Sequence, residues 1–317
     1  MATTQRGLEI RLLGSFQVTV DGCPAATGGS KRDALLALLA LRRGPVPVDA
    51  LIDALWGADG LPASPRNAIH HHVARLRAAL GQESIVGSGN SYALENASTD
   101  ALDFEDLLAE ARAALRAGDG CTAAVVAARA LALWRGRALE GLPDTLWVGA
   151  EAERLEGLRI DALEERFEAA LEVGEHREIV SELQRAIHES PFRERLWRQL
   201  MVALYRSGRA ADALETYQSA RRVHVEELGL EPGPELRRMQ EAILAHDPGI
   251  AGAAVAGARR VGPLRPVDER GDELAHVVDQ LRENLRNAQE LYERARSALE
   301  GRAVSAPPTR AFAALSG

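Results

Sequence analysis

The sequence contains only two cysteines, Cys23 and Cys121, and neither has a neighbour at the spacing of a zinc site or a disulfide framework. Aromatic residues make up 4% of the chain, whereas Ala, Leu and Arg recur throughout, so the main secondary-structure signal is helical. The longest strongly apolar run, Ala34 to Leu41, is far shorter than the roughly 20 residues that cross a bilayer. Residues 1–7 also lack the apolar core of a signal peptide. We therefore expect a largely helical protein of a reducing cytoplasm, neither secreted nor membrane-spanning.

Signatures of the common enzyme classes are also missing. The sequence has no P-loop ending in GKS or GKT, no HExxH zinc motif and no GxSxG nucleophile elbow. Adjacent acids occur at Glu164-Glu165 and at Glu226-Glu227, in charge-rich helical stretches where the pattern predicts solvated surface carboxylates. We therefore expect a protein that is not an enzyme and that needs no cofactor.

The net charge of −8 is unusual for a protein that binds nucleic acid, but the charge is unevenly distributed. Residues 1–97 contain nine Lys or Arg against eight Asp or Glu, a balance of +1, so the rest of the chain carries −9. Several basic residues of the first segment lie in one short predicted helix. The acidic total therefore does not exclude DNA binding by the N-terminal segment.

The N-terminal segment has the order of elements of a winged helix. Apolar and polar residues alternate from Leu8 to Val20 with a break at Gly14-Ser15, which predicts two short strands. Three helices are predicted next, and a β-hairpin with a flexible tip at Gly87 to Ser91 follows them. The predicted helices are one that starts after Ser30 and ends near Gly44-Pro45, one from Val48 to Trp56, and one from Pro65 to Leu80.

The third predicted helix has a favourable start, because Ser64 supplies a capping hydroxyl and Pro65 suits the first helical position. At about 100° per residue, one stripe of this helix is apolar. It comprises Ile69, Val73, Leu76 and Leu80. In a winged helix the third helix enters the major groove of DNA, so the opposite face is the candidate reading surface.

That opposite face carries side chains that can read base edges, since Asn pairs with adenine, Arg with guanine, and Ala admits a thymine methyl. The candidate base-facing residues are Asn67, His71, Ala74 and Arg75. Flanking residues of the helix and the hairpin are expected on phosphates, which position the protein without reading sequence. These candidates are Arg66, His70, Arg77, Ser88, Asn90 and Ser91. A solvated helix face has a similar composition, and the neighbouring strands and hairpin favour DNA.

Three consecutive histidines, His70, His71 and His72, raise the possibility of a metal site. Adjacent residues on a helix point about 100° apart, so these rings cannot converge on one ion. We expect no metal site here.

From Asp103 to Asp247 helix follows helix, and a shift of 34 residues aligns the segment with itself. The shift places Leu163 on Trp197, Gly174 on Gly208, and Ala186 on Ala220. Residues that fit the tetratricopeptide spacing are Trp197, Leu200, Gly208, Ala213, Tyr217 and Ala220, with a fainter copy at Leu107, Gly118, Ala123 and Ala130. Helical repeats of this kind commonly present a concave face to proteins or peptides.

The predicted fold is therefore mainly α with a small β component: an N-terminal winged helix-turn-helix followed by an all-α tetratricopeptide-like repeat domain. The expected division is a DNA-binding domain at 1–97, a helical domain at 98–248, a linker at 249–267, a heptad-patterned helix at 268–301 and a disordered tail at 302–317. The heptad-patterned helix either pairs with a second copy of itself or docks on its own repeat domain, and both readings stay open.

Several strings carry a family resemblance. They are Ile10 to Gly14, Leu35 to Leu39, Leu51 to Gly57, Val73 to Arg77, Leu133 to Gly136, Arg195 to Trp197, Ala203 to Arg209, and Glu226 to Leu236. Through these strings, residues 8–248 resemble the Streptomyces antibiotic regulatory protein family of actinobacterial activators. The resemblance implies an OmpR-like winged helix, a bacterial transcriptional activation domain, binding to repeats in double-stranded promoter DNA, and recruitment of RNA polymerase holoenzyme to a secondary-metabolite gene cluster.

The resemblance to OmpR-like activators also marks the loop between the second and third helices as a candidate polymerase contact. Its candidate residues are Gly57, Asp59, Leu61 and Ser64. A ligand-responsive regulator and a repeat-domain interaction scaffold are the alternative functions. No receiver domain precedes the winged helix, so we do not expect control by aspartyl phosphorylation.

Overall fold

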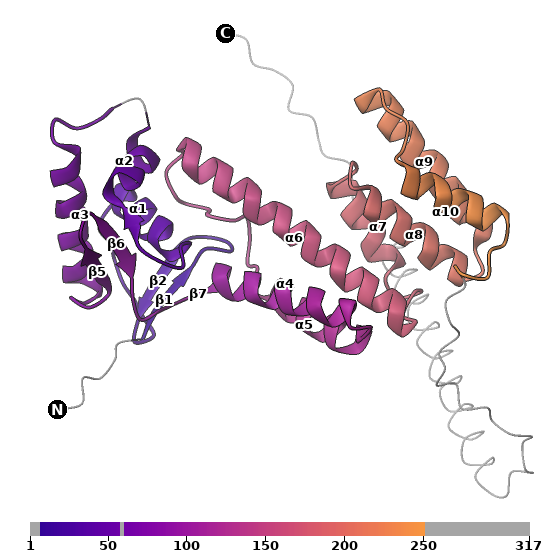
Figure 1. Ribbon diagram of the computed structural model, residues 1–317, viewed down its shortest axis with the longest axis horizontal. Coiled ribbons are helices and arrows are strands. Elements are labelled where there is room, and N and C mark those ends of the chain that lie inside the picture. The colour runs from indigo at the N-terminus through magenta and orange to yellow at the C-terminus, as the bar shows by residue number, and fades with distance from the viewer. Residues whose placement is uncertain (1–6, 58–59, 251–317) are drawn as a thin grey trace, which may run out of the picture. The chain divides into compact units, whose positions relative to one another are not determined.

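The computed structural model describes residues 7–57 and 60–250 (Figure 1). The strands are β1 (Leu8–Arg11), β2 (Gln17–Val20), β3 (Cys23–Pro24), β4 (Val46–Pro47), β5 (Ile85–Ser88), β6 (Ser91–Leu94) and β7 (Ala97–Thr99). The helices are α1 (Ser30–Ala40), α2 (Val48–Trp56), α3 (Pro65–Leu80), α4 (Asp100–Arg116), α5 (Gly120–Ala132), α6 (Leu146–Val173), α7 (Val180–Glu189), α8 (Glu194–Arg206), α9 (Ala210–Leu228) and α10 (Pro234–Leu244). Among these helices none is both long and apolar enough to span a membrane. Most of the predicted linker, the heptad-patterned segment 268–301 and the tail lie outside the described residues.

The N-terminal part contains two small sheets around three helices. One sheet has the order β3-β2-β1-β7, in which β1 pairs antiparallel with β2 and parallel with β7. The other has the order β4-β6-β5 and contains the hairpin. Helix α1 is buried at every position from Ala34 to Ala40, which explains its continuous apolar run. The order of strands, helices and hairpin confirms the predicted fold class.

Three local details differ from the prediction. Helix α3 begins at Pro65 as predicted, but the Ser64 side chain makes no capping hydrogen bond, so the proline alone favours this start. The hairpin tip is also shorter than predicted, because Ser88 pairs with Ser91 and only Gly89 and Asn90 lie outside the strands. The two-residue strands β3 and β4 and the three-residue β7 are too short to produce an alternating pattern in the sequence.

The C-terminal part is a series of helix pairs joined by glycine turns. Gly118, Gly174 and Gly208 follow α4, α6 and α8, and all have positive φ angles, of 73°, 88° and 81°. Only glycine adopts this conformation without strain, which explains the predicted recurrence of glycine near the same repeat position. The small residues Ala123 and Ala213 are fully buried, which lets the paired helices approach closely.

The prediction for Glu164 and Glu165 is wrong. Both are buried on α6, at 4% and 8% exposure, and Arg195 of α8 lies 2.9 Å from the Glu165 carboxylate. Arg112 of α4 reaches the other Glu165 oxygen at 3.3 Å. Burial of an acid requires a compensating charge, and here it comes from distant helices that the local sequence does not reveal. The second pair, Glu226 and Glu227, is exposed as predicted.

A backbone seam joins the N-terminal sheet to the repeat part. Arg135 donates its N–H to Leu13 O at 2.8 Å, and Leu139 donates to Leu12 O at 2.8 Å. Phe16 in turn donates its N–H to Glu140 O at 2.8 Å. One hydrophobic core includes buried residues from the strands, from α1 to α3, and from α4 to α6. The two parts therefore share a core as well as a set of hydrogen bonds.

Candidate nucleic-acid interface

Helix α3 is fixed to the body of the winged helix by the four residues predicted to face the core. Ile69, Val73, Leu76 and Leu80 are each at most 1% exposed. Full burial of such side chains contributes roughly 1.5–3 kcal/mol each, so the helix cannot rotate about its axis without a large loss. The stripe therefore determines which residues of α3 face outward.

The opposite face of α3 is exposed among the residues that the structure describes. Asn67, His71, Ala74 and Arg75 are all exposed. Within the described residues, Asn67 and Arg75 make no hydrogen bond or ion pair, so their donors stay available to an external ligand. Their placement on one surface agrees with the predicted reading face, while contact with DNA stays a prediction.

The residues that flank this face have partners within the protein. Arg66 donates to both carboxylate oxygens of Asp49 on α2, at 2.8 and 3.0 Å, and lies 3.5 Å from Asn90 at the hairpin tip. The pair is exposed, since the Arg66 side chain retains 59% of its surface, so its attraction is weak and its remaining donors face solvent. Arg66 therefore has a structural partner and is still available to a phosphate.

On the other flank, α3 is tied to the hairpin through Tyr92 of β6. The Tyr92 hydroxyl lies 2.6 Å from His70 Nδ1, and the Arg77 guanidinium lies 5.8 Å from the centre of the Tyr92 ring. Arg77 also donates from Nε to Ile85 O at 2.8 Å, and it is only half exposed. From the sequence we expected Arg77 and His70 to contact phosphates, and the sequence did not reveal that both also hold the hairpin against α3. Tyr92 was missed, although a lone aromatic in a short strand beside a basic helix is a signal that could reveal it.

The hairpin tip is held in one conformation. Gly89 has a φ of 59° at the first central position of the two-residue turn, where hairpin geometry requires a positive angle. Asn90 O accepts the N–H of Val48 at 2.9 Å, which ties the tip to the start of α2. Ser88 and Asn90 are exposed and Ser91 is half buried, so the first two present polar groups on the outer surface.

The three consecutive histidines point in different directions, as the helical geometry requires. His70 contacts Tyr92, His71 is exposed, and His72 stacks on Trp56 of α2 with ring centres 6.1 Å apart. Burial lowers the pKa of His72, and the positive charges of Arg32, His71 and Lys31 lower it further. In the described part of the chain no group of three metal-ligating side chains comes together.

The predicted polymerase-contact loop is partly described. Gly57 ends α2 with a φ of 58°, and Asp59 lies outside the described residues. Leu61 is 52% exposed, and Ser64 is also exposed. Leu61 and Ser64 line a shallow hollow of about 490 Å³ with Asn67, so the loop adjoins the candidate reading face.

The sequence and architecture of this chain are similar to those of known transcriptional regulators. The profile of the bacterial transcriptional activator domain matches residues 99–244. Regulatory protein DnrI of Streptomyces peucetius is 35% identical over 257 residues, a match that covers 77% of this chain and 94% of DnrI. The chain belongs to the Streptomyces antibiotic regulatory protein family of transcriptional regulators.

Other relatives are longer than this chain. Regulatory protein AfsR of Streptomyces griseus is 40% identical over 266 residues, but the match covers 83% of this chain and 27% of AfsR. The chain thus spans about a quarter of the length of that relative. The solved structure of Mycobacterium tuberculosis EmbR in complex with a low-affinity phosphopeptide superposes with a TM-score of 0.71 at 34% identity, covering 76% of this chain and 66% of EmbR. This similarity confirms the predicted fold, a winged helix followed by helical repeats.

In this member of the Streptomyces antibiotic regulatory protein family, the string from Glu226 to Leu236 builds the turn between α9 and α10. Gly229 ends α9 with a φ of 68°, and Pro234 starts α10. Gly233 donates its N–H to the Glu194 carboxylate at 2.8 Å, and a Cβ at this position would lie 2.6 Å from the other carboxylate oxygen. The positive φ explains the glycine at position 229, and the N–H of Gly233 ties the turn to α8.

Proposed function

We propose that this protein is a sequence-specific DNA-binding transcriptional activator, which binds repeats in promoter DNA of a secondary-metabolite gene cluster and recruits RNA polymerase holoenzyme. Residues 1–97 form the DNA-binding domain and residues 98–248 the activation domain in this proposal. The observation that carries it is the two-sided α3, whose apolar stripe is fully buried while Asn67, His71, Ala74 and Arg75 stand exposed on the other side. Because such a regulator acts on the chromosome, the proposal places it in the cytoplasm.

The proposed reading is assigned by the chemistry of each side chain. Arg75 has the planar fork that donates to O6 and N7 of guanine, and Asn67 has the amide that pairs with N6 and N7 of adenine. His71 adds an imidazole that donates or accepts at a base edge, and Ala74 is short enough to let the helix approach a thymine methyl. Arg66 and the hairpin tip at Ser88 and Asn90 would contact phosphates, with His70, Arg77 and Ser91 behind them.

Gel-shift titration of the full chain tests this proposal on DNA fragments from upstream of the genes that neighbour its own gene. We expect Asn67→Ala and Arg75→Ala each to weaken binding about 10- to 100-fold, and to reduce discrimination at one base position each. Arg185→Ala, which removes an exposed arginine of α7, is the matched control and should leave affinity unchanged. Equal affinity of all variants for the promoter fragments would reject the reading face.

The polymerase contact through Gly57, Asp59, Leu61 and Ser64 is a separate part of the proposal. Leu61→Ala should leave DNA affinity unchanged but reduce transcription in a reconstituted assay with polymerase holoenzyme. Leu146→Ala is the matched control, because Leu146 is also exposed, at 93%, and lies at the start of α6. Unchanged transcription by Leu61→Ala would remove this loop from the mechanism.

Self-association on DNA through the 268–301 segment also belongs to the proposal, and its support is the heptad spacing alone. Sedimentation of the chain with and without promoter DNA measures it. A single species of monomer mass on DNA would exclude self-association.

A further inference from the structure

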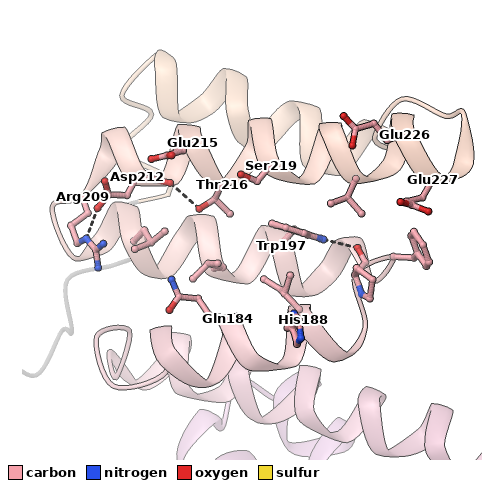
Figure 2. A pocket seen from close by; sticks show the side chains of 16 residues that line it. Gln184, His188, Trp197, Arg209, Asp212, Glu215, Thr216, Ser219, Glu226 and Glu227 are labelled. Carbon is pink, nitrogen blue, oxygen red and sulfur yellow. Dashed lines mark hydrogen bonds and ion pairs between the residues drawn. The ribbon is translucent and has the colours of Figure 1, made fainter.

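An open groove lies along α7, α8 and α9 in the repeat part, separate from every residue assigned to DNA or polymerase (Figure 2). Its volume is about 830 Å³, which is large enough for several amino-acid side chains. Helix α8 forms its floor, α7 one wall and α9 the other, as the labelled side chains show. We call it the α7–α9 groove.

The floor of the α7–α9 groove is apolar and preorganised. Trp197, Leu200 and Leu204 line it from α8, and Trp197 donates from Nε1 to Pro191 O at 2.8 Å. This bond holds the turn that carries Phe192, whose ring stands edge-on to His224 at 6.3 Å. Phe192 nevertheless keeps 48% of its surface exposed. An exposed aromatic that is held in place at the end of an apolar groove is typical of a binding anchor.

The wall formed by α9 is acidic, and three of its four carboxylates have no ion-pair partner among the described residues. Asp212, Glu215, Glu226 and Glu227 all line the groove from this one helix. Asp212 pairs with Arg209 at 2.5 Å, whereas Glu215, Glu226 and Glu227 make no ion pair with any described residue. Some acids elsewhere in the repeat part are paired, such as Glu168 with Arg198 at 2.6 Å. The groove therefore has a negative wall that lacks its counter-charge.

We propose that the α7–α9 groove binds a short basic and amphipathic segment of a partner polypeptide. Its apolar side chains would enter over Trp197, Leu200 and Phe192, and its Lys or Arg side chains would face the carboxylates of α9. A nucleic acid is the wrong partner for this surface, because its phosphates carry the same sign of charge as the α9 wall. From Asp212 to Glu227 the helix rises about 22 Å, which corresponds to about seven residues of extended peptide.

Fluorescence polarisation of the full chain with a labelled nonapeptide of alternating Arg and Leu tests the inference, and the same peptide with Glu in place of Arg is the comparison probe. We expect the Arg-Leu peptide to bind and the Glu-Leu peptide to bind at least tenfold more weakly. Removal of three groove charges in Glu215→Gln/Glu226→Gln/Glu227→Gln should weaken the Arg-Leu peptide by about tenfold or more.

Two controls separate a groove from general attraction to an acidic protein. The triple variant Glu110→Gln/Glu153→Gln/Glu178→Gln removes three exposed charges outside the groove and should change affinity less than twofold. Phe192→Ala should also weaken the peptide, whereas Leu244→Ala, at a leucine that is 59% exposed outside the groove, should not. Equal losses in the groove and control triples, or no preference for the Arg-Leu peptide, would overturn the proposal. Promoter binding should be unaffected by all these variants, so failure here is distinguishable from failure of the DNA-binding proposal.

Discussion

The carboxylate of Asp100, at the start of α4, accepts the backbone N–H of Leu12 at 2.7 Å, across 88 positions of sequence. Its second oxygen accepts the N–H of Leu13 at 3.2 Å and lies 3.2 Å from the Arg135 guanidinium. Asp100 is 9% exposed, so these bonds lie inside the structure. This one carboxylate therefore links the start of α4 to the backbone that follows β1 and to Arg135 of the seam.

We predict that Asp100→Asn destabilises the full chain by about 1–3 kcal/mol, because an amide cannot accept both N–H groups and the arginine as a carboxylate does. Urea unfolding followed by circular dichroism measures the change. Asp106→Asn is the matched control, since Asp106 lies in the same helix and pairs with Arg43 at an exposed position. It should cost less than about 1 kcal/mol. Similar losses for both variants would show that the buried carboxylate has no special importance.

Gly14 should tolerate no side chain. Its φ is 141°, and a Cβ would lie 3.1 Å from both Arg135 Cβ and Gly136 N across the seam. Gly14→Ala therefore combines backbone strain of about 1–3 kcal/mol with a contact against backbone that cannot move aside easily. Gly22→Ala has the strain alone, since φ is 77° and nothing lies within 4 Å of its Cβ. The thermal midpoint should fall further for Gly14→Ala, and equal midpoints would contradict a tight seam.

Arg75 and Arg77 should separate into different roles. Arg77→Ala loses the bond to Ile85 O and the contact with Tyr92, so we expect it to lower stability by about 0.5–1.5 kcal/mol as well as DNA affinity. Arg75→Ala should lower DNA affinity alone and leave the melting temperature unchanged. Differential scanning fluorimetry beside gel-shift titration distinguishes the two. A stability loss in Arg75→Ala of the same size would mean that it too supports the fold.

Stability should fall on mild acidification because of His72. Burial lowers its pKa from the ordinary value of 6.5, so the folded chain binds this proton less readily than the unfolded chain. The free energy of unfolding should therefore be unaffected well above pH 6.5, decrease as the pH falls below that value, and reach its full loss below the folded pKa.

His72→Phe is the variant that tests this dependence, because a phenyl ring can still stack on Trp56 but cannot take up a proton. Urea unfolding from pH 5 to 7.5 should show a smaller decrease for this variant than for the wild type. His246→Gln, at an exposed histidine of the repeat part, should retain the wild-type profile. An unchanged profile in His72→Phe would assign the acid sensitivity to other groups.

Helices α2 and α3 could be predicted from the sequence because each has an apolar stripe and local signals at its ends. The bounds Val48–Trp56 and Pro65–Leu80 agree with the structure, since Pro and Gly mark them locally. The seam and the buried Glu165 could not be predicted, because their partners lie far away in the chain. Short strands such as Ala97–Thr99 are formed by pairing with β1 rather than by their own pattern.

For the candidate site, the outward face of α3 could be predicted because helical geometry alone places Asn67 opposite Leu76. The partners of the flanking residues could not, since the Arg66 contact with Asp49 and the Arg77 contact with Ile85 depend on tertiary packing. The repeats predicted a concave face for proteins or peptides, but the residues that line the α7–α9 groove could not be predicted, for the same reason. Its acids were visible at Glu226-Glu227, but the wall opposite them comes from α7, and only the structure brings the two together.

The seam between residues 12–16 and 135–140 limits how members of this family can be recombined. A chimera that exchanges the first 97 residues for those of a relative would pair one protein's β1 end with another protein's loop before α6. The loop residues would then be transplanted with the DNA-reading part, because a relative with a side chain at position 14 would place its Cβ 3.1 Å from Arg135 Cβ and from Gly136 N. The segments that must be exchanged together to change DNA specificity are therefore not contiguous in the sequence.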